Sequence, residues 1–425
     1  MKTLTEEIYD LIVIGGGPAG MMAAGRAAER ARLDKRSLKV LLVEKNSGLG
    51  RKLLLTGGGR CNLTNAEPDE RVLLAKFKEA AKFLFSTFSK YGVRETLDFF
   101  NGRGMETKVE AGNRVFPLSD RSQSVWDVLH KYLLEEKVIV RTDAAVTGFV
   151  TNSTGAIEAI KLKGGALIRG RAFVLATGGQ SHPETGSTGD GFAWLRQLGH
   201  EVITPSAALV PITVSDLWVK KLSGIALPQA KLTIFLDGVK QETGRGKLLL
   251  THFGLSGPLA LNLSSTLSEL LKYGQVIISL DLLPEEDYSS LNDKLQELLA
   301  VEHKKKIKNA LSRLIGSGFV PVVLEQAHID GETFCHSLSR EARLRLVKDL
   351  KALLIHPTGL LGTDKAIVTS GGVALEEVDF RTMRSRLIPN LYLVGDILNI
   401  DRPSGGYSLQ LCWTTGWVAG ESVVI

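Results

Sequence analysis

The sequence has little cysteine, and its cysteines are scattered. The 425 residues include three, Cys61, Cys335 and Cys412, with no CxxC pair. This spacing argues against a disulfide framework, a structural zinc site and a redox dithiol. No apolar run is long enough to cross a bilayer, and the first ten residues lack the apolar core of a signal peptide. We therefore expect a cytoplasmic protein without a metal site or a membrane partner.

A strong excess of either charge is also missing. The formal net charge is +6, the pI is about 9.0, and the 44% apolar and 23% charged residues form an ordinary globular composition. A mild basic excess is compatible with an anionic partner such as a nucleic acid, but many enzymes with small substrates share it. The length exceeds what one hydrophobic core usually supports, so two or three domains are expected.

A glycine cluster near the N-terminus carries the strongest motif. Residues 9–14 have the continuous apolar pattern of a strand buried on both faces, and a GxGxxG follows, made of Gly15, Gly17 and Gly20 with Pro18 and Ala19 between them. Gly15 allows a tight turn, Gly17 lets a pyrophosphate approach the backbone, and Gly20 lets the next helix pack against the strand. The helix N-terminus would then bind the phosphates through free N–H groups.

The next strand, residues 40–43, completes a βαβ unit and ends at an acid. This acid, Glu44, is suited to the hydroxyls of a ribose, and we include Lys45 beside it in the expected cofactor site. A bare GxGxxG is weak evidence, but one that lies between a buried strand and a helix and precedes such an acid predicts a dinucleotide.

The C-terminal segment indicates which dinucleotide is bound. Residues 391–394 form a strand that leads into Gly395 and Asp396, and the run Gly405, Gly406, Tyr407 and Ser408 opens a helix. An acid after a strand can hold ribityl hydroxyls, and a glycine-rich helix start can point N–H groups at the N1/O2 edge of a flavin. FAD, whose length needs both ends of the chain, fits better than NAD. Because no second GxGxxG unit follows residue 100, we expect NAD(P)H only as a transient reductant.

The fold class predicted is α/β, a Rossmann-type FAD-binding domain interrupted by an insertion. The domain takes residues 1–198 and 366–425. Short alternating strands predict a β-barrel-like insertion over 199–283 and 352–365, and charged helical patterns predict a helical subdomain over 284–351.

Several runs of the sequence resemble the BaiN/RdsA-type (YhiN-like) flavoproteins. They are GRK at 50–52, TGGGRCNLTN at 56–65, RVFP at 114–117, ATGG at 176–179, TGDG at 188–191, THFGLSGP at 251–258 and GGY at 405–407. The chain departs from the pattern at Ser408, where we expect Asn, and at Cys412, where smaller residues are commoner. The resemblance implies FAD, a glutathione-reductase-like domain and an insertion that is part β-barrel and part helical.

The resemblance also implies hydride transfer from reduced FAD to a carbon–carbon double bond conjugated to a carbonyl. Two substrates are associated with such proteins: a uridine of large-subunit ribosomal RNA, which becomes dihydrouridine, and enones of the steroid or bile-acid type. The basic balance of the sequence and its Lys-rich helical insertion favour ribosomal RNA or its precursor. A flavin-containing RNA- or ribosome-binding factor without turnover is the third hypothesis.

Further site residues follow from these motifs. Lys52, Gly58, Gly59, Thr177 and Gly178 complete the expected cofactor set. We expect Arg60 to hydrogen-bond the flavin edge or a substrate carbonyl. Cys61 is either an acidic proton donor or, as we favour, a small packing residue. His252 is either a proton donor or substrate contact, or a hydrogen-bonded structural residue.

A basic run occupies residues 303–308 in the expected helical subdomain. Its lysines at 304, 305, 306 and 308 could bind phosphates, or they could form a solvated helix face with the acids interspersed among them. The sequence leaves these two interpretations open.

Overall fold

The computed structural model describes residues 7–362 and 368–423, which form two compact units. The first unit combines Met1–Ala207 with Ala366–Ile425, and the second is Ala208–Lys365. The second unit was expected to begin at residue 199 but begins at Ala208. The reason is that β10 (Val202–Ala208) pairs with β18 (Val368–Val373), which keeps residues 199–207 in the first unit. The expected boundary at 365/366 lies outside the described residues.

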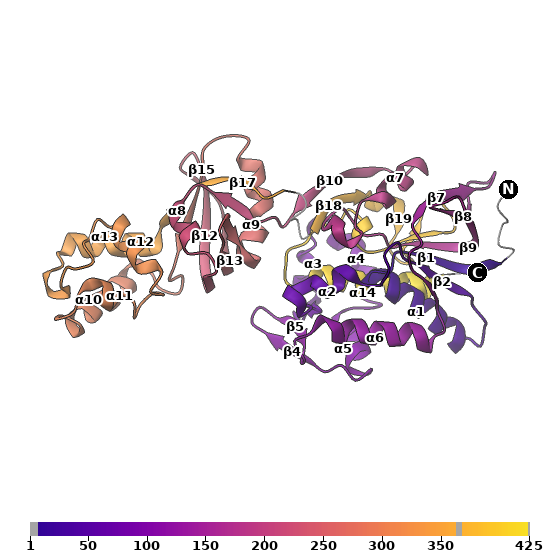
Figure 1. The fold of residues 1–425 in the computed structure, drawn as a ribbon, viewed down its shortest axis with the longest axis horizontal. Helices are drawn as coiled ribbons and strands as arrows, with labels where there is room; N and C mark the ends of the chain where they lie inside the picture. Colours follow the sequence, from indigo (N-terminus) through magenta and orange to yellow (C-terminus); the bar gives the residue numbers. More distant parts are fainter. Residues whose placement is uncertain (1–6, 363–367, 424–425) are drawn as a thin grey trace. The chain divides into compact units, whose positions relative to one another are not determined.

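Five parallel strands form the centre of the first unit (Figure 1). Their order across the sheet is β21 (Leu391–Leu393), β9 (Leu167–Leu175), β1 (Ile8–Ile14), β2 (Val40–Val43) and β6 (Ile139–Arg141). Antiparallel strands extend it: β7 (Val146–Thr151) and β8 (Ile157–Leu162) beside β9, and β19 (Val378–Asp379) and β20 (Arg384–Ser385) beyond β21. The last four residues of β1 are buried, as expected for a strand covered on both faces.

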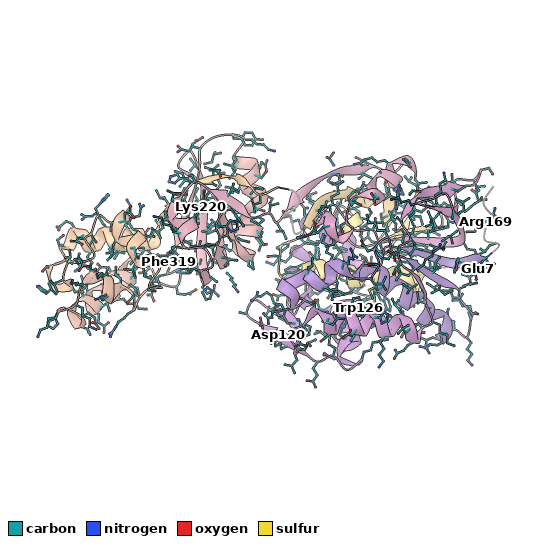
Figure 2. The ribbon with its side chains drawn as sticks, in the orientation of Figure 1. Glu7, Asp120, Trp126, Arg169, Lys220 and Phe319 are labelled. Carbon is teal, nitrogen blue, oxygen red and sulfur yellow. The ribbon has the colours of Figure 1, made fainter. Side chains whose placement is uncertain are left out.

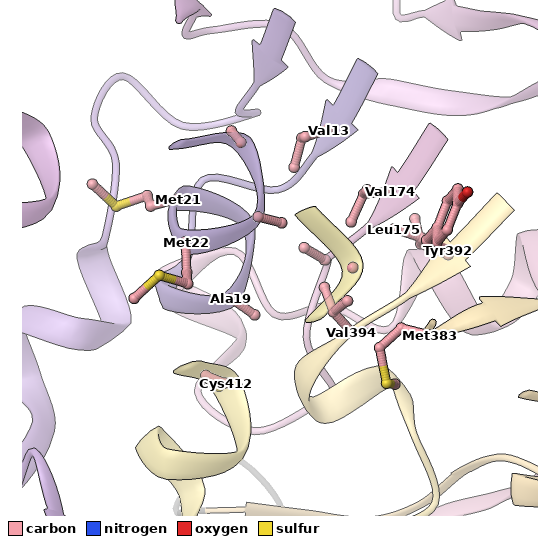
Figure 3. Close-up of a cluster of buried hydrophobic side chains, with 14 of the residues drawn as sticks. Val13, Ala19, Met21, Met22, Val174, Leu175, Met383, Tyr392, Val394 and Cys412 are labelled. Atoms are coloured by element: carbon pink, nitrogen blue, oxygen red, sulfur yellow. The ribbon is translucent and has the colours of Figure 1, made fainter. Parts of the chain in front are cut away.

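Two long helices, one from each end of the chain, contact each other on this sheet. They are α1 (Pro18–Leu33) and α14 (Tyr407–Ser422). A Cβ at Gly416 would lie 2.5 Å from the carbonyl oxygen of Ala19, so only glycine lets the two backbones approach this closely. Figure 3 shows part of the core around them, with Met21 and Met22 on one side of α1 and Val13 of β1 on the other.

Smaller elements of the first unit surround this core. They are the three-stranded sheet of β3 (Thr64–Asn65), β5 (Arg114–Pro117) and β4 (Thr107–Glu110), and the helices α2 (Arg51–Leu55), α3 (Glu70–Ala75), α4 (Ala81–Phe88), α5 (Val93–Asn101), α6 (Ser122–Glu135) and α7 (Asp190–Gln197). Asp120 follows β5, and Trp126 belongs to α6 (Figure 2).

The second unit contains a seven-stranded antiparallel sheet. Its order is β16 (Leu353–Ile355), β15 (Val276–Asp281), β12 (Ala226–Leu236), β13 (Val239–Leu250), β14 (Gly254–Ser256), β11 (Ile212–Val214) and β17 (Pro357–Leu360). The two edge strands, β16 and β17, are separated in the chain only by His356, so the sheet must curl back toward itself. The predicted fold class, an α/β Rossmann-type domain interrupted by a barrel-like and helical insertion, is confirmed.

Two helices interrupt the region in which only short strands were expected, α8 (Leu217–Lys221) and the longer α9 (Gly257–Leu270). Helix α9 packs on β13, where a Cβ at Gly244 would lie 2.8 Å from the side chain of Leu259. The sequence did carry a signal for it, since Pro258 suits a first helical turn and leucines follow at spacings of three and four.

The remaining helices of this unit share one hydrophobic core with its sheet. They are α10 (Tyr288–Val301), α11 (Ile307–Leu311), α12 (Phe319–Gln326) and α13 (Arg340–Lys351). Leu291 and Leu295 of α10 and Leu346 of α13 are fully buried there, together with Phe319, which Figure 2 labels.

Candidate cofactor-binding site

The glycine turn before α1 has the geometry that a nucleotide phosphate requires. A Cβ at Gly15, where φ is +109°, would lie 2.4 Å from the carbonyl oxygen of Ala176, and one at Gly20 would lie 1.9 Å from that of Gly15. Both positions therefore need glycine for packing. Gly17 differs, because a Cβ there would meet nothing within 4 Å. As the N-cap of α1 it has no side chain to accept the free N–H groups, which remain available to an anion.

A cavity of about 1250 Å³, open to solvent, begins at this turn. Most of its lining residues come from the β1–α1 connection, the β2–α2 connection with the start of α2, residues 176–190, and the segment from Val394 into α14. The others are Thr56, Ala144, Val146 and Trp194. Twelve of the residues predicted to bind the cofactor lie in its wall: Gly15, Gly17, Pro18, Ala19, Glu44, Lys45, Lys52, Thr177, Gly178, Gly395, Asp396 and Ser408.

Six predicted cofactor residues do not line the cavity: Gly20, Gly58, Gly59, Gly405, Gly406 and Tyr407. Two of them shape the start of α14 instead. Gly406 has a φ of +103°, and a Cβ there would lie 2.3 Å from the carbonyl oxygen of Thr64. The carbonyl of Gly405 accepts a hydrogen bond from Asn65 Nδ2 at 3.0 Å. The TGGGRCNLTN run thus ends against α14, so residues distant in sequence fix each other here.

Glu44 is buried at the end of β2 and has protein partners on both carboxylate oxygens. Oε2 accepts from the backbone N–H of Gly16 at 2.8 Å, and Oε1 accepts from Asn46 Nδ2 at 2.7 Å. Oε1 also accepts from the backbone N–H of Asn46 at 2.9 Å, so the lone pair that remains for a hydroxyl donor is on Oε2. The acid therefore braces the glycine turn and still lines the cavity.

Residues 185–190 form a wall of the cavity that the predicted site did not include. Lys45 Nζ donates to Asp190 Oδ2 at 2.9 Å, and Asn46 Nδ2 donates to the carbonyl of Thr185 at 3.0 Å. Burial alone would raise the pKa of Asp190, but hydrogen bonds from Lys45 and Thr188 outweigh it and lower that pKa. The TGDG motif at 188–191 is the feature of the sequence that indicates this wall. The contacts of the wall with Lys45 and Asn46 on the β2–α2 connection cannot be predicted from the sequence near the motif.

Lys52 brings the amine of its side chain to the wall of the cavity. Its Nζ donates to both the hydroxyl and the carbonyl oxygen of Ser181. Burial lowers the pKa of Lys52, and the negative charge of Asp396 opposes that shift. A cation in this position suits a ligand with phosphate or carbonyl oxygens.

The C-terminal wall has its own polar network. Asp396 forms an ion pair with Arg402, a buried arginine whose Nε also donates to Ser408 Oγ at 3.0 Å. Cys412 lies one helical turn further, beside Ala19 (Figure 3), and burial raises the pKa of its thiol to about 12. Arg402 therefore orients the carboxylate of Asp396 and the hydroxyl of Ser408, and both residues line the cavity. Cys412 lines the cavity as an un-ionised thiol.

The structure decides between the two roles considered for Cys61 and gives Arg60 partners other than those expected. Cys61 is completely buried and does not line the cavity, and burial raises the pKa of its thiol to about 12, so it is not an acidic thiol. The alternative, a small packing residue, describes it. Arg60 is held by Glu110 and by Asp120, whose Oδ1 accepts from Nε at 2.8 Å, and it covers the Phe116 ring at 4.2 Å. Its donors are committed to these carboxylates, and it too is absent from the cavity wall.

His252 belongs to the second unit, at the turn between β13 and β14. The turn is closed by Thr251, whose backbone N–H donates to the carbonyl of Gly254 at 2.8 Å. The imidazole is exposed, contacts Phe253 edge to face at 5.0 Å, and has no hydrogen-bond partner among residues 7–362 and 368–423. The hydrogen-bonded structural role is therefore wrong.

The cavity fits a flavin dinucleotide on two observations. Gly17 leaves open space beside the free N–H groups of α1, where a pyrophosphate would lie. Thr177 Oγ1 is buried and has no hydrogen-bond partner in the described part of the chain, although it belongs to a lining residue. A buried hydroxyl without a partner is costly, and a bound polar ligand would satisfy it.

A Rossmann-type unit with such a cavity, interrupted by an insertion of sheet and helices, defines an FAD-dependent oxidoreductase. A family model described as the HI0933-like protein Rossmann domain matches residues 9–422. The chain belongs to this family.

Three relatives align with nearly the whole chain. The 3-dehydro-bile acid delta(4,6)-reductase of Clostridium scindens is 30% identical over 96% of this chain and 98% of its own length. The ribosomal RNA dihydrouridine synthase of Escherichia coli is 29% identical over 98% of each chain. The ribosomal RNA dihydrouridine synthase of Haemophilus influenzae is 27% identical over 97% of this chain and 98% of its own length.

Neither a membrane span nor a metal cluster is found in the described ranges. No helix there is long and apolar enough to cross a membrane, and no group of three or more His, Cys, Asp or Glu side chains could hold a metal ion.

Proposed function

We propose that this chain reduces a uridine of large-subunit ribosomal RNA to dihydrouridine, with NAD(P)H as the electron donor. The observation that carries the proposal is its likeness to two ribosomal RNA dihydrouridine synthases over 98% of their lengths, the inserted second unit included. The absence of a second GxGxxG in the sequence supports a nicotinamide that binds only transiently.

Bound and reduced FAD supplies a hydride to the carbon–carbon double bond of the uracil ring. The chain's own residues hold and orient the cofactor. The N-terminus of α1 at Gly17 binds the pyrophosphate, Asp396 and Ser408 bind ribityl hydroxyls, and Thr177 Oγ1 binds a polar atom of the ligand. Glu44 positions the ribose of the adenosine half.

The reaction also needs one proton for the carbon next to the carbonyl. Cys61 is too deeply buried to deliver it, and the donors of Arg60 are committed to carboxylates. His252 stays our candidate for proton delivery or substrate contact, because its ring is exposed and its nitrogens have no partner in the described part of the chain.

Mass spectrometry of ribosomal RNA nucleosides from a deletion strain tests this function. We expect the dihydrouridine of the large-subunit RNA to fall on deletion and to return with the wild-type gene and with Cys61→Ala. A Gly17→Val gene, expected to fold but to lose FAD, should not restore it. An unchanged dihydrouridine content in the deletion strain would refute the proposal.

The bile-acid reductase among the relatives supports a second candidate, a small enone substrate. Purified holoenzyme should then oxidise NADH or NADPH in the presence of a 3-oxo-4-ene steroid. Rapid, saturable oxidation together with unchanged ribosomal dihydrouridine would assign this function instead of the first.

A further inference from the structure

The basic run at 303–308 belongs to a two-segment ribbon in the second unit. Lys306 lies directly opposite Phe334 in an antiparallel bridge. Backbone hydrogen bonds flank the bridge: Ile307 N donates to Thr333 O at 2.8 Å, and Cys335 N donates to Lys305 O at 2.9 Å. The segment 331–336 therefore fixes the basic run in one conformation.

The two faces of this ribbon differ sharply. Ile307 and Cys335 point into the core and are 0% and 3% exposed. Phe334 faces the other way and is 45% exposed, although it is a large apolar ring. Directly opposite residues of an antiparallel pair share a face, so Lys306 lies on the exposed side with Phe334.

A second ring extends the exposed aromatic surface. His336 stacks on Phe334, with centroids 5.6 Å apart and the rings 20° from parallel. Its Nδ1 lies 2.8 Å from the carbonyl oxygen of His303. A carbonyl can only accept, so Nδ1 carries the proton and Nε2 is free to bond a ligand. The two rings form a rigid platform.

Charges surround the platform unevenly. Lys306 and Lys308 both pair with Glu332, which is itself half exposed, and Lys305 pairs with the buried Glu302. Lys304 has no ion-pair partner among the residues that the structure describes. Exposed ion pairs contribute little to stability, so phosphates can replace Glu332 as the partner of two lysines at small cost.

This arrangement departs from the expected pattern of a basic helix. The helical segment 284–351 contains equal numbers of acidic and basic side chains, so its net charge does not attract a polyanion. The ribbon instead presents a local feature, an exposed pair of aromatic rings with lysines on the same face. Proteins that bind single-stranded nucleic acids combine these two elements, rings that stack on bases and cations that contact the backbone.

We propose that the Phe334–His336 platform and the lysines beside it bind an unpaired segment of RNA. A base stacks on Phe334, His336 Nε2 contacts a base edge, and Lys304, Lys306 and Lys308 contact adjacent phosphates. The inference rests on the proposed function only in naming RNA as the partner. It locates docking on the second unit, separate from the residues that hold the cofactor.

Fluorescence anisotropy with FAD-loaded full-length protein and a labelled single-stranded uridine-containing 12-mer tests the proposal. Phe334→Ala should weaken binding about tenfold or more, the size expected for loss of one stacked base. Glu332→Gln should strengthen binding by a few fold, because it releases two ammonium groups. Tyr288→Ala on α10, where Tyr288 is 56% exposed, and Lys240→Ala are the matched controls and should bind like wild type.

Salt dependence supplies a second measure. Replacing Lys304 and Lys306 by alanine should lower the slope of log affinity against log salt by about 0.7 for each lost phosphate contact. A Phe334→Ala variant with wild-type affinity, or a Glu332→Gln variant that binds more weakly than wild type, would overturn the proposal. Equal weakening by the Tyr288→Ala control would do so as well.

The RNA-binding assay and the nucleoside assay test the two proposals separately. If the deletion strain lacks dihydrouridine but Phe334→Ala binds RNA normally, the platform is wrong and the enzymatic proposal stands. If ribosomal dihydrouridine is unchanged but Phe334→Ala weakens binding and Glu332→Gln strengthens it, the RNA surface stands and the reaction is wrong.

Discussion

Gly17 is a position where cofactor binding can be removed while folding is kept. Its φ of −78° is accessible to any residue, and a Cβ there would meet no protein atom within 4 Å. The open space is part of the cavity. A Gly17→Val side chain would therefore fill the volume beside the free N–H groups of α1 without colliding with the chain.

Gly17→Val should change the stability of the fold only slightly and the affinity for FAD strongly. An aliphatic residue in place of glycine at an N-cap costs roughly 0.5–1 kcal/mol of stability, which lowers the midpoint of thermal unfolding by about 1–4 °C in a unit of this size. Each charge-assisted hydrogen bond lost between the backbone and a phosphate costs about 1.5–3 kcal/mol. Loss of one such bond makes FAD binding about tenfold to a hundredfold weaker, since 1.4 kcal/mol is a factor of ten.

FAD titration of apoprotein, followed by flavin fluorescence, measures this effect. Apo forms are compared for thermal unfolding, so that loss of the ligand does not count as loss of fold. Gly48→Val is the matched control, because a Cβ at Gly48 also meets open space but Gly48 does not line the cavity. Wild-type FAD affinity in Gly17→Val would show that the phosphates do not lie at this turn. Equal loss in Gly48→Val would show that the effect is not local.

Four further outcomes are expected. Lys45→Ala and Asp190→Asn should each speed FAD release several-fold in a fluorescence-recovery assay, because their ion pair joins two cavity walls; unchanged rates would disprove that role. The pKa of Asp190 in the folded protein lies below its ordinary value of 3.8. The stabilisation from the Lys45–Asp190 ion pair is therefore complete above pH 3.8 and is lost only as the pH falls through the lower, folded pKa. The rate of FAD release should accordingly be constant from about pH 8 to pH 5. Native Cys61, with its pKa raised to about 12, should resist iodoacetamide at pH 8.5 and react after unfolding; rapid native alkylation would contradict its burial. His252→Ala should lower turnover about a hundredfold with FAD content unchanged if the imidazole delivers the proton, and turnover within twofold of wild type would exclude that role.

The sequence predicts best where one short segment determines the outcome. The turn at Gly15 and Gly17 follows from a buried strand, a GxGxxG and a helix start, all within a few residues, and the structure has this arrangement. The helix after Gly406 follows from a similar local pattern. The FAD-binding class could be inferred from these two segments together.

Prediction fails where the decisive partner is far away in the chain. Nothing near Arg60 indicates that Asp120 and Glu110 occupy its guanidinium, and nothing near Cys61 reveals complete burial. Likewise Asp190 enters the cavity wall through a contact with Lys45, 145 residues earlier. Such pairings depend on the packed fold, and one sequence does not encode them as a local pattern.

The location of the cavity bears on how one family can hold two different reductases. Every residue that lines it belongs to the first unit, and the glycines of α14 lock the two chain ends together around it. The relatives named for a bile acid and for ribosomal RNA each align with both units. Because the residues that line the cofactor cavity belong to the first unit, substrate contacts made by the second unit can change without altering the cavity wall. The exposed Phe334 belongs to the second unit, where a substrate-specific contact of the kind proposed above would lie.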